Sequence, residues 1–150
     1  IASTLDTRFG KASEIKLKIE DICSREIITD ISQAEPIGPK KMVDLMLIAP
    51  CTGNTLAKLS NAITDTSVTM AAKSHLRVGG TLLIALATND ALGATAQNIG
   101  KMLNVKNVFF VPLSQDDPVK KPNSLVAHFD LILPAIEKAL KKEQIQPIFM

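Results

Sequence analysis

The sequence contains no tryptophan and no tyrosine, and aromatic residues make up only 3% of it. Proteins that bind RNA or single-stranded DNA commonly stack bases on aromatic side chains, so a nucleic-acid-binding function is disfavoured. The two cysteines, Cys23 and Cys51, form neither a CxxC motif nor a metal-ligand spacing. No apolar run is long enough to cross a bilayer. We therefore expect a reduced, cytoplasmic protein that has no disulfide framework and no metal site.

The sequence does contain enough apolar material for one core. Its 150 residues are 46% hydrophobic, and 17 basic against 15 acidic residues give a net charge of +2. The paired lysines along the chain are typical of solvated surface and indicate no particular ligand. Length and composition predict a single domain over residues 1–150.

Three short apolar runs stand out, at Leu45–Ala49, Thr81–Ala87 and Val108–Leu113. Each is apolar on both faces, which is typical of strands buried inside a parallel sheet. The segments between them have apolar residues recurring every three or four positions, which predicts helices. Those residues are Leu56, Leu59 and Ile63 in one segment, and Leu92, Ala96, Ile99 and Leu103 in the other. The alternation predicts a three-layer α/β fold of Rossmann or flavodoxin type, with a parallel sheet and helices on both faces.

The two ends of the chain predict further elements. Near the start, Ser13 can cap a helix that carries Ile15, Ile19 and Ile22, and Glu26–Thr29 is a short candidate strand. Near the end, an apolar stripe predicts a helix that begins at Asn123 or Ser124. The stripe consists of Val126, Phe129, Leu133, Ile136 and Leu140. Because Pro134 lies within it and lacks a backbone donor, we expect a kink there.

The loops that follow the three predicted strands are rich in small, hydroxyl and amide residues. They read APCTGNT, ATNDALG and VPLSQDDPVKKPNS. Since the carboxyl ends of parallel strands lie along one edge of a sheet, we expect these loops to meet there. In the first loop, Pro50 can stop the strand, Gly53 permits a tight turn, and Asn54 or Thr55 can cap the next helix. The helix start would favour an anion, although simple capping of a surface helix explains the same residues.

Other candidate residues have structural as well as functional interpretations. Cys51 lies beside a predicted helix start, where a thiol can become reactive, but a small packing residue is the simpler interpretation. His75 and His128 both lie in segments that we expect to be helical, and a structural role is favoured over proton transfer. Arg8 and Arg77 could bind carboxylates, or form ordinary surface ion pairs.

Asp116 and Asp117 are adjacent acids followed by a proline. Two carboxylates could contribute to a cation site, but hard cations need several oxygen ligands, and no second acidic cluster accompanies this pair. Adjacent acids before proline more often form a turn, which is the favoured interpretation.

The segment from Ala49 to Lys58 reads APCTGNTLAK, and it resembles the A-P-x-T/S-x-N-T-x-A-K motif of the flavoprotein family of homo-oligomeric flavin-containing cysteine decarboxylases. That resemblance implies a non-covalently bound flavin mononucleotide. It implies that Pro50 to Thr55 line the cofactor, with Asn54 and Thr55 at its polar edge, while Ser3 meets the phosphate. It also places Thr88 and Asn89 near the cofactor. The full set of implied cofactor-binding residues is Ser3, Pro50, Cys51, Thr52, Gly53, Asn54, Thr55, Thr88 and Asn89.

The chain also departs from the decarboxylase pattern in two ways. Where the decarboxylases place a histidine ahead of the APxTxNT strand, this sequence has Pro36, so decarboxylation of a cysteine derivative is disfavoured. Relatives begin with a further strand, a Gly/Ser-rich loop and a helix that supply much of the phosphate site, and we expect this chain to lack that unit.

Three further segments, TDTRFGKASE, TNDALG and QDDPVKKPNSLVA, resemble one branch of the family, whose members are small subunits of a two-subunit oxidoreductase of sporulation. That resemblance implies oxidation of a partly reduced pyridine dicarboxylate in the mother cell of a spore-forming bacterium. It also implies a larger partner that binds a nicotinamide cofactor, NAD(P), and homo-oligomerisation. The residues implied to lie in a substrate or partner loop are Asp116, Asp117, Lys120, Lys121 and Asn123. No residue is identified as catalytic, and the alternatives are a non-catalytic scaffold that activates the partner and a flavin-dependent cysteine-type decarboxylase.

Overall fold

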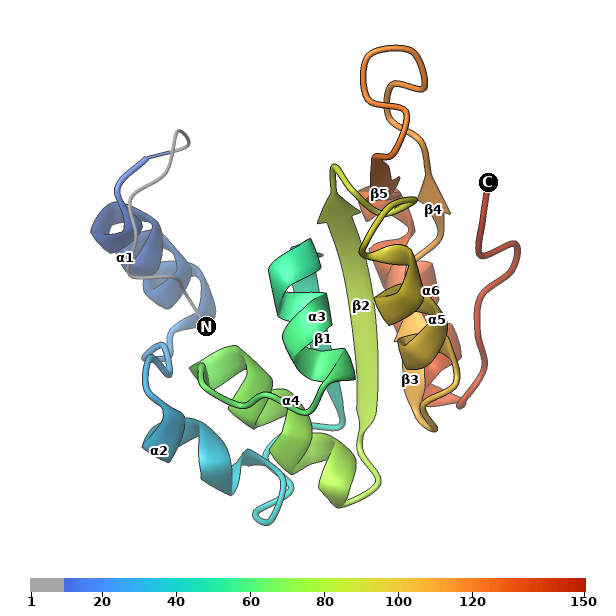
Figure 1. Cartoon of the computed structure of the whole chain (residues 1–150). Helices are drawn as coiled ribbons and strands as arrows, with labels where there is room; N and C mark the ends of the chain where they lie inside the picture. The colour runs from blue at the N-terminus through green and yellow to red at the C-terminus, as the bar shows by residue number, and fades with distance from the viewer. Residues whose placement is uncertain (1–9) are drawn as a thin grey trace.

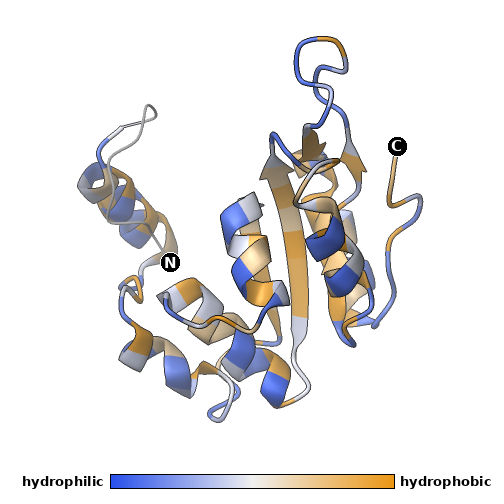
Figure 2. Ribbon diagram, in the orientation of Figure 1, coloured by the Kyte–Doolittle hydropathy of each residue, from blue (hydrophilic) through white to orange (hydrophobic). Residues whose placement is uncertain are grey.

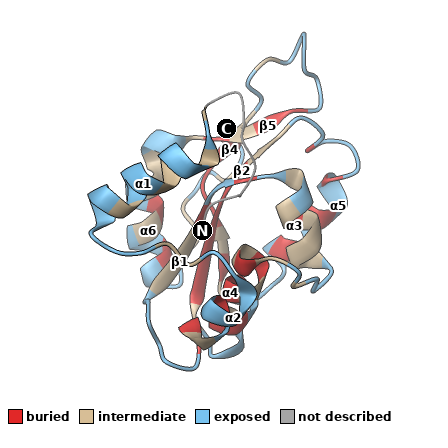
Figure 3. Ribbon diagram, turned by 90° about the vertical axis from the view of Figure 1, so that its left-hand side faces the viewer, coloured by how far each residue is buried: buried red, intermediate tan, exposed pale blue. Residues whose placement is uncertain are grey.

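A computed structural model describes residues 10–150 and shows a sheet with helices on both faces (Figures 1 and 3). The central strand is β2 (Thr81–Thr88), whose first six residues are all buried. Figure 2 shows β2 as a largely apolar strand. A strand buried on both faces must be apolar at successive positions, which is why the run TLLIALA predicts it correctly.

Strand β1 (Leu45–Cys51) runs parallel to β2, with Leu45 opposite Thr81. The register shifts between Ile48 and Cys51, so that Cys51 lies opposite Leu86. The expectation that Pro50 stops this strand is therefore wrong, because pairing resumes after the irregularity. Within residues 10–150, β1 pairs with β2 alone.

The other edge of β2 is shared by two strands. The first half of β2 pairs in parallel with β3 (Val108–Phe110), and its last two residues pair antiparallel with β5 (Leu125–Ala127). Strand β4 (Leu113–Ser114) then pairs antiparallel with β5. The α/β class with helices on both faces is confirmed, while the sheet is mixed because these antiparallel pairs extend its carboxyl end.

The helices after β1 and β2 cover one face of the sheet. They are α3 (Gly53–Ser60), α4 (Ser67–Arg77) and α5 (Ala96–Leu103). Helix α6 (Ile132–Leu140) packs on the opposite face against β1 and β2 (Figure 3). No helix among residues 10–150 is long and apolar enough to cross a membrane.

The N-terminal helices lie outside this sandwich. Helix α1 (Ala12–Cys23) begins at the expected place, although Lys11 rather than Ser13 is its N-cap and none of its residues is buried. It stands apart from the sheet in Figure 1. Two short helices, α2 (Ile31–Ala34) and η1 (Glu35–Ile37), pack against α4.

The predicted strand at Glu26–Thr29 is wrong, because these residues have no strand pairing. The backbone N–H of Ile27 instead donates to the Glu20 carboxylate at 2.9 Å, which satisfies the group without a neighbouring strand. Isolated apolar residues cannot establish a strand when no partner edge lies beside them.

The C-terminal helix also differs from its prediction. Residues 125–127 form β5, a short 3-10 helix η2 (Phe129–Leu131) follows, and α6 begins only at Ile132. Pro134 therefore lies in the first turn, where a backbone N–H has no acceptor within the helix. The reason for expecting a kink is therefore absent, because the proline removes no helical hydrogen bond.

Candidate functional site

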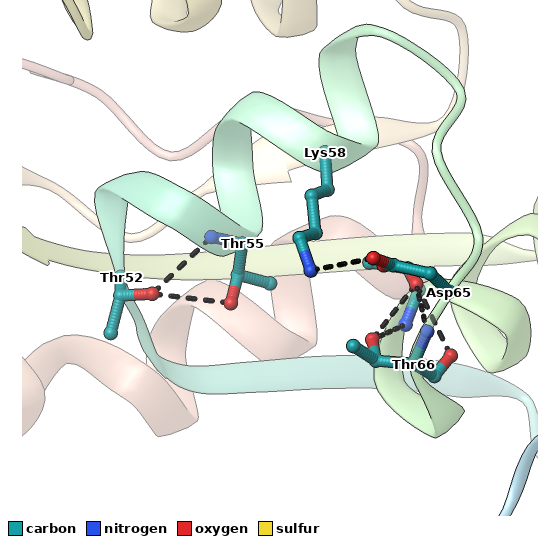
Figure 4. A network of polar contacts seen from close by, with 6 residues as sticks. Thr52, Thr55, Lys58, Asp65 and Thr66 are labelled. Carbon is teal, nitrogen blue, oxygen red and sulfur yellow. Dashed lines mark hydrogen bonds and ion pairs between the residues drawn. The ribbon is translucent and has the colours of Figure 1, made fainter.

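The first loop of the rim leads directly into α3. Thr52 is the N-cap, with extended backbone, and its hydroxyl accepts a hydrogen bond from the Thr55 N–H at 3.3 Å (Figure 4). The expectation that Asn54 or Thr55 caps the helix is wrong, because both lie inside its first turn. The backbone N–H groups of Gly53 and Asn54 have no acceptor within the described part of the chain. They give this helix start two free donors beside its positive dipole end.

Gly53 brings the first two loops together. A Cβ atom at this position would lie 2.7 Å from the Thr88 hydroxyl and 3.0 Å from the Thr95 hydroxyl. Gly53 is helical, so the predicted role in a tight turn is wrong. Glycine instead allows the start of α3 to lie close to the second loop, because any side chain here would push that loop away.

Asp90 organises the second loop. One oxygen of its carboxylate accepts hydrogen bonds from the hydroxyls of Thr88 and Thr95, both at 2.8 Å. These two hydroxyls, that of Thr88 more strongly than that of Thr95, hold the pKa of Asp90 below its ordinary value. The sequence predicted no role for Asp90 or Thr95, although an Asp two residues after a strand-ending Thr is a known turn signal.

The base of the third loop meets the second. The Leu92 N–H donates to the carbonyl of Asn123 at 3.0 Å, and the buried Ser124 hydroxyl donates to the side chain of Asn89 at 3.5 Å. The expected convergence of the three loops is thus borne out for their bases. Beyond the base, the loop projects above the sheet in Figure 1.

The acidic pair of the third loop forms a turn, as expected. Asp117 accepts a hydrogen bond from the Lys120 N–H at 2.9 Å, and Asp116 pairs with the Lys121 ammonium at 2.9 Å. The Ser124 hydroxyl and Lys121 together hold the pKa of Asp116 at about 2. Among residues 10–150, no group of three His, Cys, Asp or Glu side chains could hold a metal ion.

A cavity of about 200 Å³ lies beside β1. It is lined by the five consecutive residues Met46 to Pro50, by Thr55 of α3 and by Val68 of α4. Since side chains alternate between the two faces of a strand, five consecutive residues can line one cavity only along the strand's edge. The cavity therefore follows the edge of β1 that faces away from β2. None of its described lining residues has a titratable side chain.

Of the predicted cofactor-binding residues, two line this cavity and others lie in the helix start and loop next to it. Pro50 and Thr55 line it, and Thr52, Gly53 and Asn54 form the adjacent helix start. Thr88 is half-buried and Asn89 is exposed, both in the second loop. Ser3 lies outside the described residues, as does Arg8. The strand-edge residues before Pro50, and Val68, are lining residues that the motif did not indicate.

Cys51 points into the core instead. It is fully buried, and burial raises the pKa of its thiol to about 12. A thiol in this state is not a nucleophile at neutral pH, so the packing interpretation is the correct one. Cys23, at the end of α1, is exposed.

Neither histidine lines the cavity. His75 is buried in α4, as expected, at the end of the molecule opposite the rim. His128 is not helical: it follows β5, and its Nε2 atom lies 2.8 Å from the Ser114 hydroxyl. Arg77 is exposed on α4 and forms no ion pair within the described residues.

Known proteins resemble this chain in both sequence and structure. The B subunit of dipicolinate synthase from Bacillus subtilis (strain 168) is 50% identical over 145 residues, which cover 97% of this chain and 72% of that protein. The crystal structure of the same subunit from Bacillus halodurans has a TM-score of 0.90 and 44% identity, and covers 100% of this chain and 77% of that one.

A more distant structure has the same fold. The FMN-dependent cysteine decarboxylase SpaF has a TM-score of 0.63 and 21% identity, over 85% of this chain and 70% of that one. A model of the flavoprotein family matches residues 2–137 of the sequence. The chain thus belongs to the flavoprotein family.

Proposed function

We propose that this chain is the flavin-binding component of a dipicolinate synthase, which acts with a larger, nicotinamide-binding partner. The observation that carries this proposal is the cavity along the edge of β1, which is lined by apolar side chains and by Thr55 of α3. The start of the same helix carries the N–H groups of Gly53 and Asn54, which have no acceptor among the described residues. A flavin mononucleotide combines an apolar ring system with a polar, anionic tail. A cavity that is lined by apolar side chains and lies beside a helix start suits such a molecule.

The residues present fit this cofactor in their chemistry. Pro50 and Thr55 would lie against it at the cavity, and the helix start at Thr52 to Asn54 would face its polar edge. Thr88 and Asn89 would approach from the second loop, and Ser3 from the N-terminal segment. Cys51 packs beneath the site without contributing its thiol. When bound, the flavin would supply the capacity to accept or donate electrons.

The proposed reaction is oxidation of a dihydrodipicolinate-type compound to dipicolinate. The partly reduced ring loses a hydride and a proton and becomes aromatic, and the hydride passes to an oxidised redox cofactor. The partner would bring a nicotinamide cofactor, and the naming of both relatives as the B subunit of their enzyme supports the presence of a partner. Because none of the described residues that line the cavity has a titratable side chain, the contribution of this chain would be to bind and orient.

The projecting third loop is the proposed contact with the substrate's carboxylates or with the nicotinamide-binding partner. Lys120 and Asn123 are exposed on it, while Lys121 is engaged by Asp116. Asp117 shapes the turn that presents Lys120. We also propose that the chain forms a homo-oligomer, as its family resemblance implies.

Reconstitution tests the proposed function. The protein should bind FMN, turn yellow, bleach with dithionite and recover in air. Mixed with the nicotinamide-binding partner and the dihydropyridine precursor, it should increase dipicolinate formation when FMN is added. A protein that stays colourless with excess FMN would contradict the cofactor assignment.

A second candidate function is a non-catalytic scaffold that activates the nicotinamide-binding partner. The absence of any titratable side chain among the described cavity residues favours it. A protein that increases the activity of the partner equally with and without FMN would establish this candidate instead. Decarboxylation remains disfavoured, because Pro36, the residue at the place of the family's histidine, lies in η1 against α4 rather than at the cavity.

Asn54→Asp tests the placement of the site. The substitution adds a negative charge at the second residue of α3, where we expect the polar edge of the flavin, and it should weaken FMN binding by about tenfold or more. Ser13→Asp is the matched control, because it adds the same charge at the second residue of the exposed helix α1. Equal FMN affinity in both variants would contradict the placement.

A further inference from the structure

A second cavity, separate from the rim, lies on the helical face of the sheet. It has a volume of about 390 Å³ and opens between α4 and α5, beyond the C-terminal end of α3. Since α3 starts at the carboxyl end of β1 and α4 ends just before β2 begins, this groove lies at the amino end of the strands. It is therefore remote from the rim loops, although Thr69 in its lining directly follows Val68, which lines the cavity along β1.

The groove has an apolar interior. Met102 of α5 is buried at 2% exposure, Leu59 and Leu76 are half-buried, and Ile63 and Val105 remain partly exposed at its margin. The volume falls within the range of small-molecule sites, which are mostly apolar with a few polar groups that fix orientation.

The two charged side chains that line this groove are both positive. Lys73 and Arg77 both line it, and their spacing of four residues places them one turn apart on the same face of α4. Neither forms an ion pair within residues 10–150, and none of the described lining residues is acidic. The nearby Asp65 is already paired with Lys58 at 2.9 Å (Figure 4).

We propose that this groove binds a small anion with an apolar body, such as an aliphatic or aromatic carboxylate. The apolar part would lie against Met102 and Leu76, and the carboxylate would pair with Lys73 and Arg77. Charge complementarity commits the site to an anion, because a cationic ligand would meet two uncompensated positive charges. The groove shares no lining residue with the cavity along β1, so its occupancy does not depend on the proposed function.

Octanoate and 1-octanol provide a matched pair of probes, since they share the apolar chain and differ in charge. Titration calorimetry on the full chain should show octanoate binding about tenfold tighter than 1-octanol. The double variant Lys73→Gln with Arg77→Gln should lose this preference while its affinity for 1-octanol stays the same. The control double variant, Lys18→Gln with Arg25→Gln, removes the same charges from outside the groove and should bind both probes like the original protein.

Val105→Phe tests the location independently of charge. Val105 is 40% exposed at the margin of the groove, so a larger side chain can enter the groove without disturbing the core. This variant should bind neither probe, while its far-UV circular dichroism and its FMN affinity stay unchanged. The proposal is overturned if octanoate binds no better than 1-octanol, or if Val105→Phe binds octanoate normally. It is also overturned if the original protein self-associates without binding octanoate and Val105→Phe abolishes that self-association. The groove would then be a contact between protein chains.

Discussion

At the scale of single residues, His75 is a buried titratable group whose ring lies against Gly80. Its side chain is 3% exposed, and a Cβ atom added at Gly80 would lie 2.4 Å from the imidazole ring. Both ring nitrogens lack a hydrogen-bond partner within the described residues. Burial lowers the pKa of His75, and Lys142 lowers it further, against opposing contributions from the Thr81 backbone and Asp44. The folded protein therefore favours the neutral imidazole.

This burial predicts a loss of stability in mild acid. Below the ordinary histidine pKa of about 6.5 the unfolded chain binds a proton that the folded chain resists, so the free energy of unfolding falls as the pH drops. The His75 contribution should be at most about 1.4 kcal/mol per pH unit, ending at the folded-state pKa. Urea unfolding between pH 7.5 and 5 measures it, and His75→Leu should show a shallower dependence. An equal slope in both proteins would show that His75 does not titrate on unfolding.

Two glycines give a second prediction at this scale. Gly53→Ala places a methyl group 2.7 Å from the Thr88 hydroxyl and 3.0 Å from that of Thr95, so the second loop must move. We expect the free energy of unfolding to fall by about 1–2 kcal/mol, the usual cost of overpacking. Gly100→Ala is the control: it lies within α5 with nothing within 4 Å, and alanine should add about 0.5–1 kcal/mol there. Denaturant unfolding of the two variants should give changes of opposite sign.

At the scale of elements, the sequence predicts a strand well where both of its faces are buried. It predicts a strand poorly where pairing with a segment distant in the sequence determines the structure. The cores of β1 and β2 are predicted because burial on both faces leaves a continuous apolar run. Residues 125–127 look helical in isolation, but their backbone pairs with Ala87 of β2 and Leu113 of β4, which no local pattern can reveal. The same holds for the candidate site. The ends of the predicted strands indicate where the loops lie, but the position of the cavity depends on which edge of β1 is unpaired, and the sequence does not reveal that.

Strand β3 shows how a short element is completed from elsewhere in the chain. The side-chain oxygen of Gln144 accepts from the Phe110 N–H at 2.8 Å, and its amide group donates to the Phe110 carbonyl at 2.7 Å. The side chain thus replaces one residue of a neighbouring strand. Because Phe110 is fully buried, both backbone groups would otherwise lack partners.

Removing this side chain should destabilise the protein markedly. Gln144→Ala leaves two buried backbone groups of Phe110 unsatisfied, and the free energy of unfolding should fall by about 2–4 kcal/mol. Gln97→Ala removes the same side chain from an exposed position of α5 and should change it by less than about 0.5 kcal/mol. Chemical denaturation of both variants measures the difference. Similar small effects would mean that water replaces the Gln144 contacts at no cost.

At the scale of the whole molecule, the fold separates two regions that the sequence could not distinguish. The carboxyl end of the sheet gathers the three loops, and the cavity along β1 runs from Met46 to Pro50 beside them, whereas the groove with Lys73 and Arg77 lies at the amino end. Parallel strands followed by helices produce this polarity, since every strand-to-helix turn falls at the same end. Ligands at the two ends should therefore stabilise the folded chain independently.

FMN binding provides a whole-molecule test, because a ligand that binds only the folded state raises its stability by mass action. At a concentration one hundred times the dissociation constant, FMN should add about 2.7 kcal/mol. For a chain of this size that raises the midpoint of thermal unfolding by several degrees, which differential scanning calorimetry resolves. Riboflavin, which lacks the phosphate, should give a smaller increase at the same concentration if the free N–H groups of Gly53 and Asn54 hold the anionic end. Equal increases for the two flavins would show that the phosphate lies away from the start of α3, and no increase with either would exclude a flavin site in this chain.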